Sequence, residues 1–249
     1  MLGIFFLIGL VIGSFINALI YRLPRRLGIN GRSICPSCKS KITWYDLIPL
    51  LSFAFLKGRC RKCRKSISIT YPLVELLTGL IFFQFASSVS LTTGNLIYLI
   101  FIFFVLACFV ALLFIDLKYF ILPDTIVYSI IFITIAYLVL NPSGAEKQLL
   151  GAVLWGGIFA LIYWASKGKW IGFGDVKLTA AIGLLFGALD GFFVIYVAVV
   201  VGAVVGVILL IARKANLKTK IPFGSFLAGA SIIFILFGKI IYNIFNIFI

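Results

Sequence analysis

The sequence predicts an all-α polytopic membrane protein with about eight transmembrane helices and a small cytoplasmic module between the first and second helices. Of its 249 residues, 63% are hydrophobic and only 12% are charged, and the mean hydropathy is +1.21. A soluble domain of this length could not cover so much apolar surface with so few charges. The apolar residues also cluster in long runs, and about 20 such residues cross a bilayer as a helix.

Eight apolar runs are candidates for the spans, although the sixth is short and needs help from the residues before it. They are Leu2–Tyr21, Tyr71–Ser88, Leu96–Ile115, Thr125–Leu140, Leu149–Ala165, Val176–Gly187, Gly191–Ala212 and Ser225–Phe248. We divide the chain into a first helix at 1–21, a cytoplasmic module at 22–70 and a seven-helix membrane core at 71–249.

Basic residues predict the orientation. The chain has 22 Lys+Arg against 7 Asp+Glu, and a net charge of +15 would suggest nucleic acid in a soluble protein. Twelve of the basic residues lie between Arg22 and Ser68, and the basic loops further along fall on the same side of the membrane. Basic loops stay in the cytoplasm, so both termini are expected outside. We therefore expect membrane lipid, and not nucleic acid, to be the partner of this charge.

The cytoplasmic module contains two CxxC pairs. Cys35 and Cys38 lie in CPSCKSKI, Cys60 and Cys63 lie in CRKCRKSI, and 21 residues separate the pairs. This pattern is typical of a tetrahedral Zn(II) site with four thiolate ligands. A cytoplasmic location argues against disulfides, and so short and polar a segment needs a staple to fold. We predict a structural zinc without a catalytic role, with a redox pair or free thiols as the alternative.

The chain has no histidine, which limits its possible chemistry. Ser-His-Asp and Cys-His nucleophiles and HExxH zinc proteases are excluded. Asp116 in ALLFIDLKYFILPD and Asp175 in GFGDVKL are both expected at the cytoplasmic face of the membrane core. Two carboxylates that share a proton can activate water against an amide, one as base and the other as acid. We predict that these two aspartates are catalytic; the alternative is that they are unrelated helix-end residues.

The remaining polar residues of interest have mainly structural interpretations. Asp124 is expected to be the N-cap of the fourth run. Glu75, inside YPLVELLTG, is an acid at membrane depth, so it is a functional candidate that could also pair with a lysine or cap a neighbouring helix. Asp46 is expected to be a local cap or an ion-pair partner, and Glu146 a solvated residue in an external turn. Asn17 is expected to form a hydrogen bond inside the bundle.

Together these motifs resemble those of the bacterial prepilin peptidases, or type IV leader peptidases, a family of GxGD membrane aspartyl proteases. The likeness runs nearly from end to end of the chain. It is carried by GSFINALIYRLPRR, by CPSCKSKITWYDLIPLLSFAFLKGRCRKCRKSISITYPLVELLTG, by FIDLKYFILPDTI and GFGDVKL, and by IPFGSFLAG.

The resemblance places the catalytic aspartates of the family on Asp116 and Asp175, and its cysteine tetrad on the four module cysteines. It implies a bacterial inner-membrane enzyme, with its active site facing the cytoplasm, that removes the basic leader of type IV prepilins and pseudopilins after a glycine. Many members then methylate the new N-terminus with S-adenosylmethionine. The sequence shows no nucleotide-binding fingerprint such as GxGxxG after a strand, so methylation rests on the resemblance alone.

Two alternatives remain open at this point. One is an intramembrane GxGD aspartyl protease with a non-pilin client, and the other is a small cation transporter. A transporter would need an acid-lined route through the membrane. The sequence instead places its two acids at one face, which favours hydrolysis.

Overall fold

The computed structural model describes residues 2–28, 31–89, 95–214, 216 and 219–247, so Phe248, at the end of the eighth expected run, lies outside it. The described residues are helical, with no strand and two isolated β-bridges, which confirms the all-α prediction. The chain forms two compact units, residues 1–111 and 112–249. The boundary falls inside one long helix, and each unit is described by itself.

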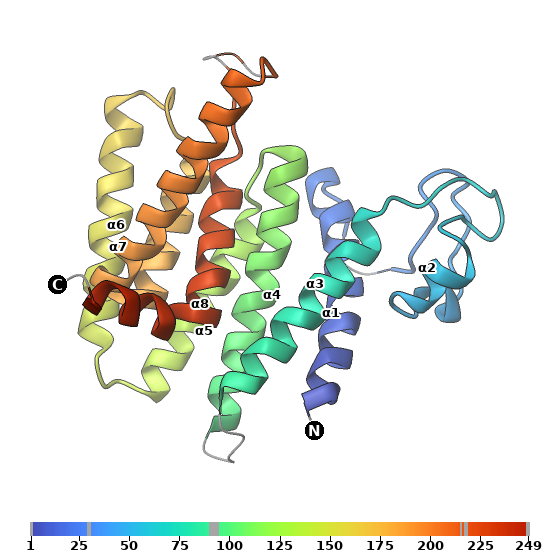
Figure 1. Ribbon diagram of the computed structural model, residues 1–249, viewed down its shortest axis with the longest axis horizontal. Helices are drawn as coiled ribbons and strands as arrows, with labels where there is room; N and C mark the ends of the chain where they lie inside the picture. The colour runs from blue at the N-terminus through green and yellow to red at the C-terminus, as the bar shows by residue number, and fades with distance from the viewer. Residues whose placement is uncertain (1, 29–30, 90–94, 215, 217–218, 248–249) are drawn as a thin grey trace. The chain divides into compact units, whose positions relative to one another are not determined.

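The first unit contains α1 (Leu2–Arg22), η1 (Leu23–Arg25), η2 (Trp44–Leu47), α2 (Leu51–Phe55), α3 (Thr70–Ser88) and the first part of α4 (Leu96–Tyr119). Figure 1 shows α1 and α3 side by side, with the segment that carries η2 and α2 forming the connection between them.

Small residues let the backbones of α1 and α3 touch. A Cβ atom on Gly9 would lie 2.7 Å from the Cα atom of Gly79, and one on Gly13 would lie 2.7 Å from the Cα atom of Glu75. Asn17 continues this face and donates its side-chain N–H to the carbonyl oxygen of Tyr71 at 2.9 Å. The expected hydrogen bond of Asn17 inside the bundle is therefore confirmed.

The second unit contains the end of α4 and four further helices, α5 (Asp124–Leu140), α6 (Ala145–Ala165), α7 (Phe173–Ile211) and α8 (Phe223–Ile247). Its core is aliphatic, and its fully buried side chains include Leu112, Ile115, Ile130, Leu178 and Ile182. These residues come from α4, α5 and α7, so the end of α4 is held inside the packed unit.

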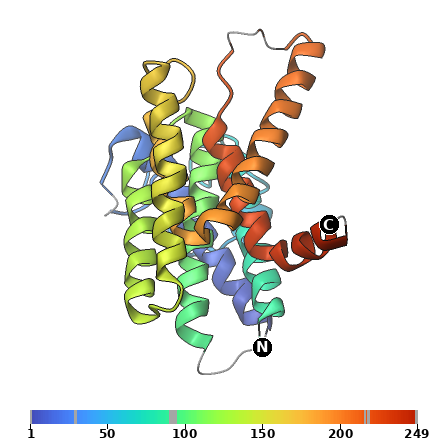
Figure 2. The same ribbon diagram turned by 90° about the vertical axis from the view of Figure 1, so that its left-hand side faces the viewer.

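Helix α7 contains a sharp reversal at Gly187, which has φ 86° and ψ −171°. This backbone conformation is essentially restricted to glycine. A Cβ atom on Gly191 would lie 3.6 Å from the Cα atom of Gly183, although eight residues of straight helix would separate them by about 12 Å. The views in Figures 1 and 2 agree that the second arm returns to the end where the first arm begins. The two arms match the sixth and seventh expected runs.

Among the described residues, five helices are long and apolar enough to cross a membrane: α1 (with η1), α3, α4, α6 and α7. Helix α5 and the Phe223–Gly238 part of α8 are shorter apolar helices. Helix α4 continues to Tyr119, four residues beyond its expected end. The charged residues end the apolar run but not the helix, and Lys118 lies in the last turn, where a cation interacts favourably with the helix dipole.

Candidate active site and metal centre

Asp116 lies in the last turns of α4 and is only 4% exposed. Its Oδ2 atom accepts the backbone N–H of Ser225, in the first turn of α8, at 2.7 Å. Just beyond Asp116, α4 ends where Phe120 takes a left-handed conformation with φ 57°. The carboxylate is therefore fixed by a backbone donor from a helix that is more than a hundred residues away in the sequence.

Asp175 is the third residue of α7 and is half-buried. Its Oδ2 atom accepts the backbone N–H of Gly172, the N-cap residue, at 3.0 Å. This bond satisfies one of the donors that the first turn of a helix leaves without a partner. The carboxylate is thus held at the positive end of the helix dipole.

Leu122 contacts the segments on either side of it that hold the two aspartates. A Cβ atom on Gly174 would lie 3.2 Å from the Leu122 Cβ atom, and one on Gly224 would lie 2.7 Å from its Cδ2 atom. The loop after Asp116 therefore packs against the residue before Asp175 and against the residue before Ser225. A side chain at either glycine would press on Leu122, so both glycines allow this close approach.

The structure corrects the expectation for Asp124. Pro123 is the N-cap of α5, and Asp124 is the first helical residue, without a capping bond from its side chain. It forms an ion pair with Lys177 of α7 instead. The Lys177 ammonium also lies 5.2 Å from the centroid of the Phe173 ring and 5.6 Å from that of Tyr128. A proline that already fixes φ leaves the aspartate free to reach α7.

Glu75 has a structural partner in the first unit. It is 8% exposed, and its Oε2 atom accepts the backbone N–H of Leu50 at 2.9 Å. Leu50 is the residue immediately before α2 and has a positive φ of 60°. Glu75 therefore ties the segment that carries α2 to α3, and its partner is not a lysine.

The four module cysteines come together as expected. The sulfur atoms of Cys35, Cys38, Cys60 and Cys63 all lie within 4.8 Å of one another, and those of Cys35 and Cys63 are 3.9 Å apart. Four sulfurs bound to one zinc at ~2.3 Å would be ~3.8 Å apart in a tetrahedron. The site can therefore hold a metal ion, and its donor set fits zinc.

The two CxxC segments fold as copies of one turn. In each, the first cysteine exchanges backbone hydrogen bonds of 2.9 Å with the residues after the second, Lys39 and Ser40 in one copy and Arg64 and Lys65 in the other. Lys39 and Arg64 share a left-handed conformation, with φ of 57° and 60°. The repeated turn places two sulfurs from each copy at one centre.

The protonation of these thiols also favours a cation. The Ser40 hydroxyl and backbone N–H lower the pKa of Cys38 to about 6. For Cys63, a backbone N–H from Lys65 lowers the pKa, but burial and hydrogen bonds from the neighbouring cysteines raise it to about 11. Four close thiols cannot all ionise without a cation, and a dication would bind the thiolate form of each.

Asp46 links the module together. It accepts hydrogen bonds from the Thr43 hydroxyl at 2.8 Å and from the Arg61 guanidinium, whose closest contact is 2.7 Å. The Arg61 hydrogen bonds and the Thr43 hydroxyl lower the pKa of Asp46. The expected ion-pair role is confirmed, and it ties η2 to the second CxxC turn.

Sequence reasoning did not single out Ser225 or Leu122, and it left Lys177 without a role. The segment IPFGSFLAG contained the signal for Ser225, since a glycine and a serine at a helix start provide space and a free N–H. The partner of that N–H depends on tertiary contact, which local pattern does not reveal.

Comparisons with known proteins agree with these motifs. Residues 7–89 match the family model of the bacterial peptidase A24 N-terminal domain, and residues 99–207 match that of the type IV leader peptidase family. A prepilin leader peptidase/N-methyltransferase of Aeromonas salmonicida (strain A449) is 36% identical, over 94% of this chain and 89% of the relative. One from Bacillus subtilis (strain 168) is 32% identical, over 96% and 95%. No solved structure matches the chain with significance.

Proposed function

We propose that this chain, which belongs to the type IV leader peptidase family, is a membrane aspartyl endopeptidase that removes the leader of type IV prepilins and pseudopilins. The observation that carries the proposal is the pair of aspartates in the second unit. Each carboxylate is held by one backbone N–H, and Leu122 packs against Gly174, next to Asp175, and against Gly224, next to the Ser225 donor of Asp116. The relatives named above support the choice of substrate.

The proposed chemistry uses Asp116 and Asp175 with one water molecule. One carboxylate takes a proton from the water molecule while the water oxygen attacks the scissile carbonyl carbon. The other, protonated, donates to the carbonyl oxygen, so the tetrahedral intermediate forms without a separated charge. When the intermediate collapses, the carboxyl group that took the proton from water gives it to the leaving amine as the C–N bond breaks. The other carboxylate takes back a proton from one hydroxyl of the intermediate, which becomes the new carbonyl. The backbone bonds from Ser225 and Gly172 keep one oxygen of each acid occupied, which leaves the other oxygen for the reaction.

A second activity, N-methylation of the new N-terminus with S-adenosylmethionine, is part of the proposal because the relatives are named as N-methyltransferases as well. The donor supplies an electrophilic methyl group, and the amine released by cleavage is the acceptor. We assign no residue to the binding of this cofactor.

We propose that the cysteine centre holds a structural zinc. Four thiolates fill a tetrahedral site and leave no position for water, so the metal would stabilise the fold of the module and take no part in cleavage. The proposed location is the bacterial inner membrane, with the aspartates at the cytoplasmic face and both termini outside. The basic stretch Arg22–Ser68 supports this orientation.

The names of the relatives do not favour a different client or a cation transporter. A direct test is to incubate the purified, detergent-solubilised protein with a prepilin-like peptide that has a basic leader, a glycine at the junction and an apolar helix. Mass spectrometry should find one cut after the glycine, and a further mass increase of one methyl group when S-adenosylmethionine is added. An intact peptide, in protein that is folded and loaded with zinc, would reject the peptidase assignment.

A further inference from the structure

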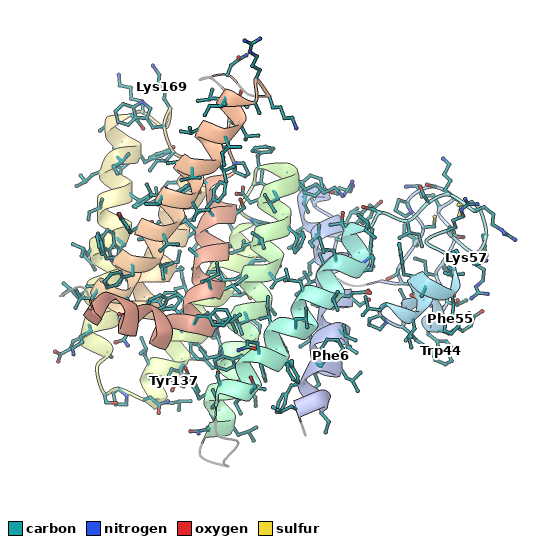
Figure 3. All side chains as sticks on the ribbon, in the orientation of Figure 1. Phe6, Trp44, Phe55, Lys57, Tyr137 and Lys169 are labelled. Carbon is teal, nitrogen blue, oxygen red and sulfur yellow. The ribbon has the colours of Figure 1, made fainter. Side chains whose placement is uncertain are left out.

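The cytoplasmic module carries an exposed apolar surface that the proposed chemistry does not use. We call it the apolar edge, and it consists of Trp44, Ile48, Leu51 and Phe55. Trp44 is 76% exposed and Phe55 is 82% exposed. Leu51 and Phe55 are one turn apart in α2, so they share a face. Figure 3 shows Trp44 and Phe55 on the same side of the module. Large apolar side chains grouped on a small polar module mark an interaction surface.

The depth of this surface follows from the bond between Leu50 and Glu75. Glu75 is the sixth residue of α3, so it lies ~7 Å along the helix from the start of the span. Because the N–H of Leu50 is 2.9 Å from the Glu75 carboxylate, the start of α2 lies at that level too. Helices that lie in a membrane interface bury their apolar face ~5–10 Å into the headgroup and acyl boundary. The apolar edge therefore begins at interfacial depth.

The charge of the module identifies the partner. Residues 22–70 hold twelve Lys+Arg, and their one acid, Asp46, is already paired with Arg61. Lys57 and Arg59 directly follow α2 and are exposed. Such a surface attracts the anionic lipids of a cytoplasmic leaflet and repels a basic leader peptide. Tryptophan is also enriched at the membrane–water boundary, where its ring is partly in contact with lipid and partly with water.

We propose that the apolar edge is seated in the anionic cytoplasmic leaflet, with Trp44, Leu51 and Phe55 in the headgroup and acyl boundary. Lys57 and Arg59 then lie at the level of the lipid phosphates. Because Asp46 joins η2 to Arg61 of the second CxxC turn, this contact also fixes the depth of the cysteine centre. This proposed contact of the apolar edge with lipid does not depend on the peptidase assignment.

Tryptophan fluorescence of the full-length protein in lipid nanodiscs tests whether the apolar edge contacts lipid. The contribution of Trp44 is the difference between the wild type and Trp44→Phe, which conserves an aromatic ring. In nanodiscs of phosphatidylglycerol and phosphatidylcholine, lipids brominated near the headgroup should quench roughly half or more of that contribution. A control reporter, Ser37→Trp in the Trp44→Phe background, lies in an exposed polar turn and should not be quenched.

The lipid charge supplies a second arm of the test. In nanodiscs of phosphatidylcholine alone, or in the variant with Lys57→Gln and Arg59→Gln, quenching of Trp44 should fall about twofold or more. Water-like emission of Trp44 without quenching would overturn the proposal. Equal quenching in nanodiscs with and without phosphatidylglycerol would overturn it too. An emission shift that needs an added prepilin peptide would make the edge a substrate surface instead and would also overturn it.

Discussion

Each of the two units contains a buried acid that accepts a backbone hydrogen bond, but the proposed roles of the two acids differ. Each buries an acid near one end of a long helix, and each satisfies that acid with a backbone N–H from a distant segment. In the first unit Glu75, 8% exposed, accepts the N–H of Leu50 at 2.9 Å. In the second unit Asp116, 4% exposed, accepts the N–H of Ser225 at 2.7 Å.

The two buried acids differ in whether another acid belongs to the same group of packed segments. The segment that anchors Asp116 packs through Leu122 against the residue before Asp175, whereas Glu75 is bonded to the strained turn before α2. Burial and a backbone hydrogen bond are therefore shared by a structural acid and a proposed catalytic acid. A functional assignment for a membrane-depth carboxylate needs a second group with which it can exchange a proton.

The comparison is tested most severely by removing either proposed catalytic acid. Asp116→Asn and Asp175→Asn should each lower kcat/KM for cleavage of a prepilin peptide by at least about a thousandfold, because the two acids act as one unit. The matched control is Glu146→Gln, an exposed acid in the first turn of α6, which should cleave like the wild type. Near-normal cleavage by either aspartate variant, at equal expression, would sink the assignment.

The next largest effect should come from the cysteine centre, and it should act through folding. Cys35→Ser should lose the zinc, expected at about one per chain, and should expose the module to protease, because a structural zinc contributes a large share of the folding free energy of such modules. Cys108→Ser, in α4 outside the centre, is the control and should keep its metal. Elemental analysis gives the zinc content, and an absence of zinc in wild-type protein prepared without chelators would contradict the site.

Substitution of Glu75 should have a smaller effect on cleavage. Comparison of two substitutions there distinguishes a structural acid from a catalytic one. Glu75→Gln keeps an oxygen for the Leu50 N–H, so cleavage should change by less than about threefold. Glu75→Leu leaves that N–H without a partner, which should cost about 1–3 kcal/mol of local stability. Hydrogen exchange across residues 44–56 measures the loosening. If Glu75→Gln were as inactive as Asp116→Asn, the distinction between the two units would be wrong.

The smallest effect should follow from breaking the ion pair between Asp124 and Lys177. The Asp124 side chain is 58% exposed although that of Lys177 is only 15% exposed, so solvent screens the pair from one side, and exposed pairs contribute about 0.2–1 kcal/mol. Asp124→Asn should therefore lower kcat/KM by no more than about fivefold. A double-mutant cycle with Lys177→Gln would show whether the two losses are coupled. An inactive but well-expressed Asp124→Asn would mean that Asp124, and not Asp116, belongs to the catalytic pair.

Much of this architecture was predictable from the sequence because the bilayer imposes simple rules. The run lengths located the helices. The CxxC spacing predicted the cysteine centre, since four thiolates in a short basic segment have few other uses. The break between the sixth and seventh runs corresponds to the reversal at Gly187.

The details that failed depend on tertiary contact. Asp124 was expected to cap α5, which is the local preference of an aspartate at a helix start. The ion pair with Lys177 uses a residue 53 positions away, and no local pattern contains that information. Ser225 was missed for a related reason, because a helix start in the sequence indicates a free N–H but not the acid that accepts it. The end of α4 was placed too early because a charged residue was taken as the end of the helix.

The reversal at Gly187 also has a consequence for biogenesis. The arm from Phe173 to Gly187 rises only about 21 Å, which is less than the ~30 Å hydrocarbon core. We therefore expect that this arm cannot partition from the translocon as an independent segment and must enter the lipid together with the second arm, as a helical hairpin. A bulkier residue at position 187 would favour one continuous helix. The two arms would then no longer insert as a hairpin, and the start of α7 with Asp175 would be placed incorrectly in the membrane. Selection at Gly187 would then act on how the chain is inserted, before any substrate is met.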